Sequence, residues 1–206
     1  MSVTAIAAHR RTQEERSHAT QARILEATLE CLAELGYAGT TTIVVAEHAG
    51  VSRGAQLHHF PTRASLISAA VQHLFAQLTD RYARAFTRVP AGAERIGAAV
   101  DLLWEIFQDA RLTAVLELYV AARTDAELHR ELVPIAERHH EKVLHLARGY
   151  FPDTALEGDA FAALLDVVLD ALQGLAVRRL VTSDPTTLRR SVDLVKEIAR
   201  RAISEE

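Results

Sequence analysis

The stretch TTIVVAEHAGVSRGAQLHHF, residues 41–60, predicts two short helices joined by a tight turn. Thr41 or Thr42 can cap the first helix through its hydroxyl oxygen. Gly50 ends that helix, since glycine adopts the left-handed backbone conformation at low steric cost. Ser52, two residues later, is placed to cap a second helix. The two helices must therefore cross at a steep angle.

The second helix combines a thin first turn with several hydrogen-bond donors. Gly54 keeps its start narrow, and Pro61 ends it. The donors that we expect to be accessible are Arg53, Gln56, His58 and His59. A short helix of this kind fits a DNA major groove, where base edges are read by such donors. The stretch is therefore predicted to be a helix-turn-helix.

This stretch resembles the helix-turn-helix of the tetracycline-repressor (TetR) family of bacterial transcriptional regulators. The family's pattern appears here as Thr40-Thr41, Val45-Ala46, Ala49-Gly50-Val51-Ser52, Gly54, His59-Phe60 and Arg63. Two positions depart from the pattern: Leu57 replaces the usual tyrosine and Arg63 the usual lysine, both of which contact DNA phosphates in family members. Because Leu57 cannot donate a hydrogen bond, the phosphate contact is expected to be weaker or to move to His58 or Arg63.

The resemblance implies an all-α regulator with two parts. It predicts an N-terminal three-helix DNA-binding unit, joined by a long helix to a larger helical ligand-binding and dimerisation core. The implied partners are double-stranded DNA with a palindromic operator, a small-molecule effector and a second copy of the chain. The DNA-contacting residues would be Thr41, Thr42, Ser52, Arg53, Gly54, Gln56, His58, His59 and Arg63, with Thr41, Thr42 and Arg63 acting mainly on phosphates.

Composition independently favours an all-α protein in a reducing compartment. The 206 residues are 49% hydrophobic but only 5% aromatic, and runs typical of strands are missing. The single Cys31 excludes an intramolecular disulfide and suits a buried position in a helix. The first residues do not form a signal peptide, and no stretch of about 20 apolar residues predicts a membrane span. We expect a cytoplasmic protein.

The charge balance leaves a second interpretation open. Formal net charge is −4, whereas DNA-binding domains are often basic. Over residues 1–65 six arginines (10, 11, 16, 23, 53 and 63) balance six glutamates (14, 15, 26, 30, 34 and 47). The alternative function is therefore a helical small-molecule-binding or scaffolding protein whose DNA-binding unit is degenerate. Salt-dependent binding to duplex DNA distinguishes the two.

Apolar spacing and breakers predict the remaining organisation. Residues 1–17 are expected to be a flexible tail, 18–78 the DNA-binding domain and 79–206 the ligand-binding and dimerisation domain. Helices are predicted over 18–35, closed by Gly36, and over 63–86 as one long connector. Five more follow over 93–109, 112–123, 126–151, 158–182 and 186–204, with Pro134 expected to kink or divide the third of these.

The helix over 158–182 is apolar on nearly every side, so a partner is expected to cover part of it. Together with the last helix it would form a four-helix bundle about a twofold axis. The predicted dimer interface comprises Leu164, Leu165, Val168, Leu172, Leu175, Val192 and Val195.

Candidate chemistry elsewhere is sparse. The histidines around His139 lack the spacing of a helical metal pair, and motifs for nucleophiles, phosphates or dinucleotides are missing. We therefore expect no metal, no cofactor and no enzymatic activity. Inward-facing aromatics are usually core, but the resemblance implies a ligand cavity among these helices. The predicted ligand-binding residues are Phe75, Leu78, Trp104, Phe107, Tyr119, Arg123, His139 and Phe161.

Overall fold

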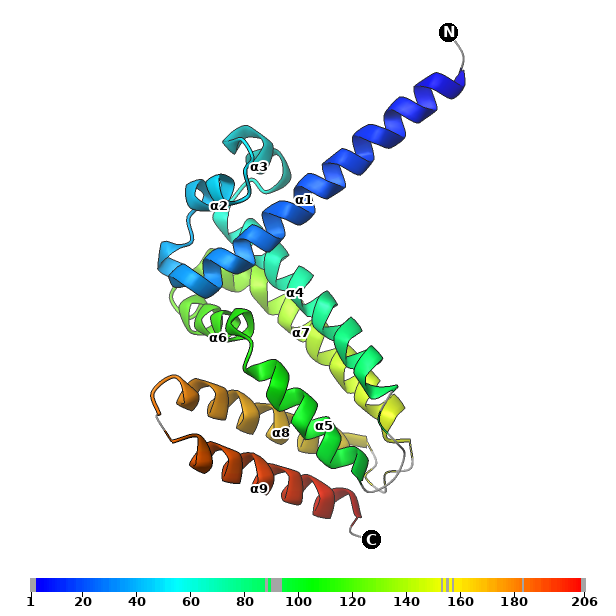
Figure 1. Cartoon of the computed structure of the whole chain (residues 1–206), viewed down its shortest axis with the longest axis vertical. Helices are drawn as coiled ribbons and strands as arrows, with labels where there is room; N and C mark the ends of the chain where they lie inside the picture. Colours follow the sequence, from blue (N-terminus) through cyan, green and yellow to red (C-terminus); the bar gives the residue numbers. More distant parts are fainter. Residues whose placement is uncertain are drawn as a thin grey trace. The chain divides into compact units, whose positions relative to one another are not determined.

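The computed structural model describes residues 3–87, 89, 94–152, 154, 156, 158–182 and 184–204. These residues form nine helices (Figure 1). In chain order they are α1 (Val3–Gly39), α2 (Thr42–His48), α3 (Arg53–His59), α4 (Arg63–Phe86), α5 (Glu94–Phe107), α6 (Ala110–Ala122), α7 (Ala126–Tyr150), α8 (Gly158–Arg179) and α9 (Pro185–Ser204). No strand occurs in this part of the chain, so the predicted all-α class is confirmed.

The chain divides into two compact units whose boundaries fall inside helices. Unit 1 comprises Met1–Leu74 and Ala114–Ile135, and unit 2 comprises Phe75–Thr113 and Ala136–Glu206. The sequence predicts a single boundary after residue 78. The segment 114–135 instead packs with the N-terminal unit, a long-range association that local patterns do not encode. Helices α4, α6 and α7 each contribute residues to both units.

The helix-turn-helix forms as its capping residues predict. The Thr41 hydroxyl accepts a hydrogen bond from the Val44 amide at 3.3 Å, and the Ser52 hydroxyl accepts one from the Ala55 amide at 3.2 Å. Gly50 has φ of 61°, the left-handed conformation expected of it. Helices α1, α2 and α3 pack on one another, as Figure 1 shows. The short helices therefore obtain their stability from burial against α1.

Helix α1 differs from the prediction at its start and agrees with it at its end. It begins at Val3, so the expected tail of residues 1–17 is helical over its described part. The segment is rich in Ala, Arg and Glu, which favour helix, although it lacks an apolar stripe. At the other end Gly36 adopts φ 68° and ψ −178°, which breaks the helix where the sequence predicted. A Cβ at Gly36 would lie 3.1 Å from the Glu117 carboxylate, so a close contact also favours glycine here.

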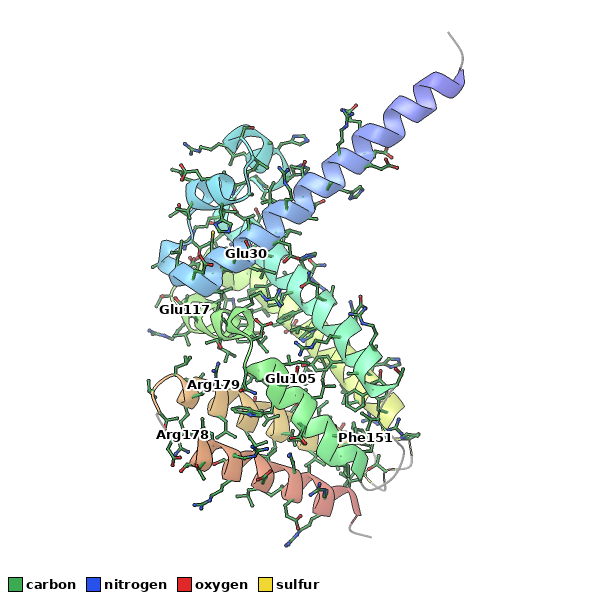
Figure 2. The ribbon with its side chains drawn as sticks, viewed as in Figure 1. Glu30, Glu105, Glu117, Phe151, Arg178 and Arg179 are labelled. Carbon is green, nitrogen blue, oxygen red and sulfur yellow. The ribbon has the colours of Figure 1, made fainter. Side chains whose placement is uncertain are left out.

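The turn that follows Gly36 is attached to α6 and to the turn before α7. The Tyr37 amide donates to Glu117 Oε1 at 2.9 Å, and the Tyr37 hydroxyl donates to Asp125 Oδ2 at 2.6 Å. Asp125 also caps α7, because its Oδ1 accepts from the Leu128 amide at 2.9 Å. Figure 2 labels Glu117 on α6. We call Tyr37, Glu117 and Asp125 the Tyr37 anchor; it belongs wholly to unit 1.

In unit 2, helices α5, α8 and α9 pack against one another. Helix α8 has Phe161, Val168, Leu172 and Ala176 buried. By length and composition alone α8 could span a membrane, and it is the one described helix of which this is true. The expectation that no stretch is long and apolar enough is therefore wrong. Helix α7 is continuous through Pro134, so the proline does not divide it, and the boundary between the units follows at Ile135.

The Tyr37 anchor predicts a pH-dependent contribution to stability. Tyr37→Phe removes a hydrogen bond to a carboxylate and should lower the free energy of unfolding by about 1 to 2 kcal/mol near neutral pH. The amide of Leu128 and the Tyr37 hydroxyl lower the pKa of Asp125. Because the folded pKa is depressed, the stabilisation is present above the unfolded value, about 3.9, and is lost as pH falls through the folded pKa.

Urea denaturation of wild type and Tyr37→Phe at a series of pH values measures this effect. Tyr119→Phe is the control, because the Tyr119 hydroxyl makes no hydrogen bond within the described residues. We expect the Tyr37→Phe difference to shrink in acid and the control to stay near wild type throughout. Equal stability of the Tyr37→Phe variant and wild type near pH 7 would contradict the role given to the anchor.

Candidate nucleic-acid interface and ligand cavity

The exposed face of α3 is the strongest candidate for DNA contact. Arg53, Gly54, Leu57 and His58 are exposed, and they recur at the spacing i, i+1, i+4 and i+5 of one helical face. His59 is half-buried at the edge of this face. We call Arg53, Gly54, Leu57 and His58 the reading face. It combines one permanent cation, one histidine, one apolar side chain and one position with no side chain.

Gln56 corrects the predicted list of accessible donors. Its side chain is only 1% exposed, and its Nε2 has no hydrogen-bond partner among the described residues. Position 56 lies on the opposite side of α3 from the reading face, between Ser52 and Phe60 in helical register, and Phe60 is also buried. Gln56 is therefore part of the unit 1 core. Its polar character alone suggested an exposed position.

The residues expected to contact phosphates occupy different environments. Thr41 is exposed and Thr42 half-buried, but the Thr41 hydroxyl already caps α2. Arg63 is half-buried: its Nε donates to the Thr40 carbonyl at 2.8 Å, its Nη2 donates to the Tyr37 carbonyl, and its guanidinium lies 4.0 Å from the centre of the Tyr37 ring. These donors satisfy carbonyls at the end of α1. In this structure Arg63 extends the Tyr37 anchor to the start of α4.

Unit 2 contains an apolar cavity of about 80 Å³. Its wall is contributed by α4, α5, α7, α8 and α9, with aromatic and aliphatic side chains. The lining residues include Tyr82, Phe86, Val100, Tyr150, Phe161 and Leu165. Phe86 and Tyr150 stack with ring centres 4.2 Å apart, and the Tyr150 hydroxyl donates to the Ala83 carbonyl at 3.3 Å. Burial raises the pKa of Tyr82, so this phenol stays neutral at physiological pH.

The structure does not bring the eight predicted ligand-binding residues together. Among them only Phe161 lines the apolar cavity. Tyr119 and Arg123 belong to unit 1 and are exposed, whereas the other six belong to unit 2. Trp104 lines a separate polar groove with Asp101, Arg179 and Lys196, and Phe75, Leu78 and Phe107 are buried core residues. Aromatic character marked buried positions correctly but did not show which of them share one cavity.

His139 is a half-buried histidine stacked on Phe75. The two ring centres are 3.9 Å apart with planes inclined by 11°, and His139 Nδ1 is buried without a hydrogen-bond partner. Burial, with smaller contributions from Lys142 and His140, lowers the pKa of His139 to about 4. The ring is therefore neutral at pH 7. His139 supplies packing rather than charge at this position.

The predicted dimer residues divide between the core and the cavity wall. Leu172 is 0% exposed, and Val168 and Val192 are also buried within the chain, so these three cannot form an interface without unfolding it. Leu164 and Leu165 line the apolar cavity, as does Val168. Leu175 and Val195 are half-buried. Large apolar side chains are exposed on α8, just after its C-terminal end and on α9. They are Val167, Val177, Leu180, Val181, Leu194 and Ile198.

Several functional candidates were missed in the sequence. Leu57 was noted only as a departure from a family pattern, although its i+4 spacing from Arg53 placed both on one face. Tyr82 and Phe86 continue the apolar spacing that predicted the length of α4. Their part of the cavity wall could therefore have been predicted from the sequence. The contacts of Glu117 and Asp125 with Tyr37 have no local signal, because Tyr37 is at least 80 residues away in the chain.

Comparison with known proteins places the chain in a family. The sequence profile described as bacterial regulatory proteins of the tetR family matches residues 24–70. CymR of Pseudomonas putida, an HTH-type transcriptional regulator, is 35% identical over 191 residues, covering 93% of this chain and 94% of CymR. BetI of Rhizobium meliloti, also an HTH-type transcriptional regulator, is 27% identical over 178 residues, 84% of each chain.

Solved structures share the fold. FadR of Bacillus subtilis in complex with stearoyl-CoA has a TM-score of 0.64 at 16% identity, over 89% of this chain and 98% of FadR. The multidrug binding protein EbrR in complex with ethidium has a TM-score of 0.62 at 24% identity, over 87% and 98%. With the capped helix-turn-helix and the extent of the match to CymR, these findings lead to one conclusion: the chain is a member of the TetR family of bacterial transcriptional regulators.

Proposed function

We propose that this regulator is a homodimeric repressor that binds a palindromic operator in the cytoplasm and is released from it by a small hydrophobic ligand. The reading face of α3 is the observation that carries the DNA-binding part. Its side chains are exposed on a helix whose opposite side is buried, and both helices of the motif are capped at their N-termini. Such a helix can enter a major groove without rearranging its own core.

The absence of a strong positive charge limits how DNA affinity arises. Net charge is −4, so long-range attraction to DNA is weak and contacts within the groove must supply much of the affinity. Arg53 is the cation of the reading face, while Arg63 donates to carbonyls of its own chain. We therefore assign base recognition to Arg53 and His58, with phosphate contacts from Thr41 and Thr42.

The exposed apolar side chains of α8 and α9 support the homodimer. Val167, Val177, Leu194 and Ile198 are large, exposed and confined to two helices that pack on each other. Large apolar side chains exposed on two packed helices suit an interaction site. A second copy would cover it, and the twofold axis would relate two reading helices to two half-sites of a palindrome.

The apolar cavity supports the hydrophobic ligand and suggests how it acts. A volume of about 80 Å³ is well below the ~300 Å³ or more of typical ligand sites. A drug-sized ligand can therefore enter only if helices around the cavity separate. Tyr82 and Phe86 of α4 line the cavity, and the same helix begins at Arg63 beside the Tyr37 anchor. A ligand that prefers an expanded cavity would shift α4 and thereby lower DNA affinity.

The first prediction from this function distinguishes the role of Arg53 in base recognition from the role of Gln56 in the core. Arg53→Ala should relax preference at one base pair in each half-site, with discrimination falling by about 1–3 kcal/mol. Gln56→Leu should keep operator selectivity and raise the free energy of unfolding by about 1 kcal/mol, since it removes an unpaired buried amide. Sequences selected from random duplex DNA, followed by titration at several salt concentrations, measure both effects.

Arg123→Ala is the matched control for Arg53→Ala, because it removes an exposed arginine from the turn after α6 rather than from the reading face. It should leave operator selection unchanged. If wild type selects no sequence and shows no salt-dependent affinity for duplex DNA, the alternative of a helical protein with a degenerate DNA-binding unit replaces this proposal.

A second prediction concerns assembly. Ile198→Glu places a charge on the exposed apolar surface and should yield folded monomers that bind the operator poorly. Leu172→Glu should instead unfold unit 2, because it buries a charge in the core of the same chain. Light scattering and circular dichroism distinguish the two results, with Arg130→Glu on the exposed side of α7, outside α8 and α9, as control. A wild-type monomer at micromolar concentration would exclude the proposed dimer.

A third prediction tests the cavity. Val100→Phe adds volume to the cavity wall and should prevent ligand entry while leaving operator affinity within about twofold of wild type. Compounds that release wild-type protein from DNA would be found by screening apolar aromatic and long-chain molecules. They should release the variant only at much higher concentration. Equal response of the two proteins would place the effector site elsewhere.

By linkage, operator DNA must weaken ligand binding by the same factor by which ligand weakens DNA binding, typically about 5–150-fold. Titrating an effector into free and operator-bound wild-type protein measures this factor. Equal affinities would show that occupation of the cavity is not coupled to DNA binding.

A further inference from the structure

The reading face contains one large apolar side chain that the packing of the chain does not explain. Leu57 is 47% exposed, although its neighbours Gln56 and Phe60 on the other side of α3 are buried. It lies one helical turn after Arg53 on the same face. We propose that Leu57 is a base-reading residue that recognises the 5-methyl group of a thymine in each operator half-site. This inference rests on the proposed DNA-binding function.

Access to Leu57 is open on the side where DNA would approach. Side chains on a helix lean toward its N-terminus, so Leu57 covers the turn that contains Arg53 and Gly54. Gly54 has no side chain to compete for that space, and a Cβ placed there would meet only the Ser52 hydroxyl, at 4.0 Å. A flat base edge can therefore reach Leu57 without displacing another residue.

The chemistry of Leu57 selects thymine among the four bases. Thymine alone presents an apolar group, its 5-methyl, in the major groove, whereas cytosine presents an amino donor that Leu57 cannot satisfy. Leucine has no donor for a phosphate oxygen either. Contact with the methyl group removes apolar surface of both partners from water. The same side chain therefore favours thymine and disfavours a polar base edge at that position.

The spacing within α3 also locates the thymine. Arg53 and Leu57 are four residues apart, which corresponds to roughly 6 Å along the helix axis. Base pairs are spaced by about 3.4 Å, so the thymine should lie within about two base pairs of the base that Arg53 contacts. Arginine most often pairs with the O6 and N7 of guanine. Each half-site should thus contain a guanine and a thymine separated by no more than two positions.

Replacement of thymine by deoxyuridine tests the proposal directly, because it removes only the methyl group. An operator is first selected from random duplex DNA with wild-type protein, and each thymine is then replaced singly in both half-sites. Fluorescence anisotropy at fixed salt gives the affinities. Wild type should bind about fourfold more weakly when the recognised thymine is replaced, the factor expected for one methyl-sized apolar contact.

Variants at position 57 connect this loss to the leucine. Leu57→Ala should bind the thymine and uracil operators equally, with an affinity for the thymine operator reduced to about that of wild type for the uracil operator. Leu57→Met keeps an apolar contact and should retain the discrimination. Val120→Ala is the control, because it shortens an exposed apolar side chain on α6 and should behave as wild type. Thermal unfolding checks that each variant is folded.

Each outcome has a distinct meaning. If wild type selects an operator but tolerates uracil at every thymine, or if Leu57→Ala discriminates as wild type does, the assignment of Leu57 is overturned while DNA recognition stands. If wild type selects no operator, the proposed function fails and this inference fails with it. The expected pattern of wild-type discrimination lost in Leu57→Ala and kept in Leu57→Met supports the assignment.

Discussion

The functional surface of unit 1 depends on the burial of one side of α3. A helix of seven residues is too short to be stable alone, so it must pack against its neighbours, and the residues that pack are unavailable for DNA. Gln56 and Phe60 occupy the buried side. Arg53, Gly54, Leu57 and His58 are exposed as a direct consequence. Burial, rather than the polarity of each residue, therefore selects the side chains that can read bases.

The Tyr37 anchor holds the turn that precedes the helix-turn-helix in place within unit 1. Tyr37 connects the end of α1 to Glu117 and Asp125, and Arg63 adds two donors to carbonyls of the same turn. Since Arg63 is the first residue of α4, the anchor lies where the connecting helix meets the DNA-binding unit. A displacement of α4 would have to strain or break these contacts. The Tyr37 anchor therefore opposes the ligand-induced shift of α4 that we propose.

Helix α8 has apolar residues both on its buried side and on its exposed side. Leu165 and Val168 line the cavity, Leu172 is in the core, and Val167 and Val177 are exposed. This explains why the helix is apolar on nearly every side and why its composition also satisfies the requirement for a membrane span. A ligand in the cavity and a partner on the exposed side would contact opposite faces of one helix. Cavity and proposed interface are therefore adjacent without sharing a residue among those named here.

The all-α class, the two caps, the glycine turns at Gly36 and Gly50, the approximate bounds of most helices and the family could be predicted from sequence. These features depend on residues within a few positions of one another, so local chemistry is sufficient. Four features could not be predicted without tertiary contacts: the burial of Gln56, the inward contacts of Arg63, the cavity lining and the exposed side of α8. Each depends on side chains from helices distant in the chain, and helical periodicity identifies an apolar face without showing what covers it.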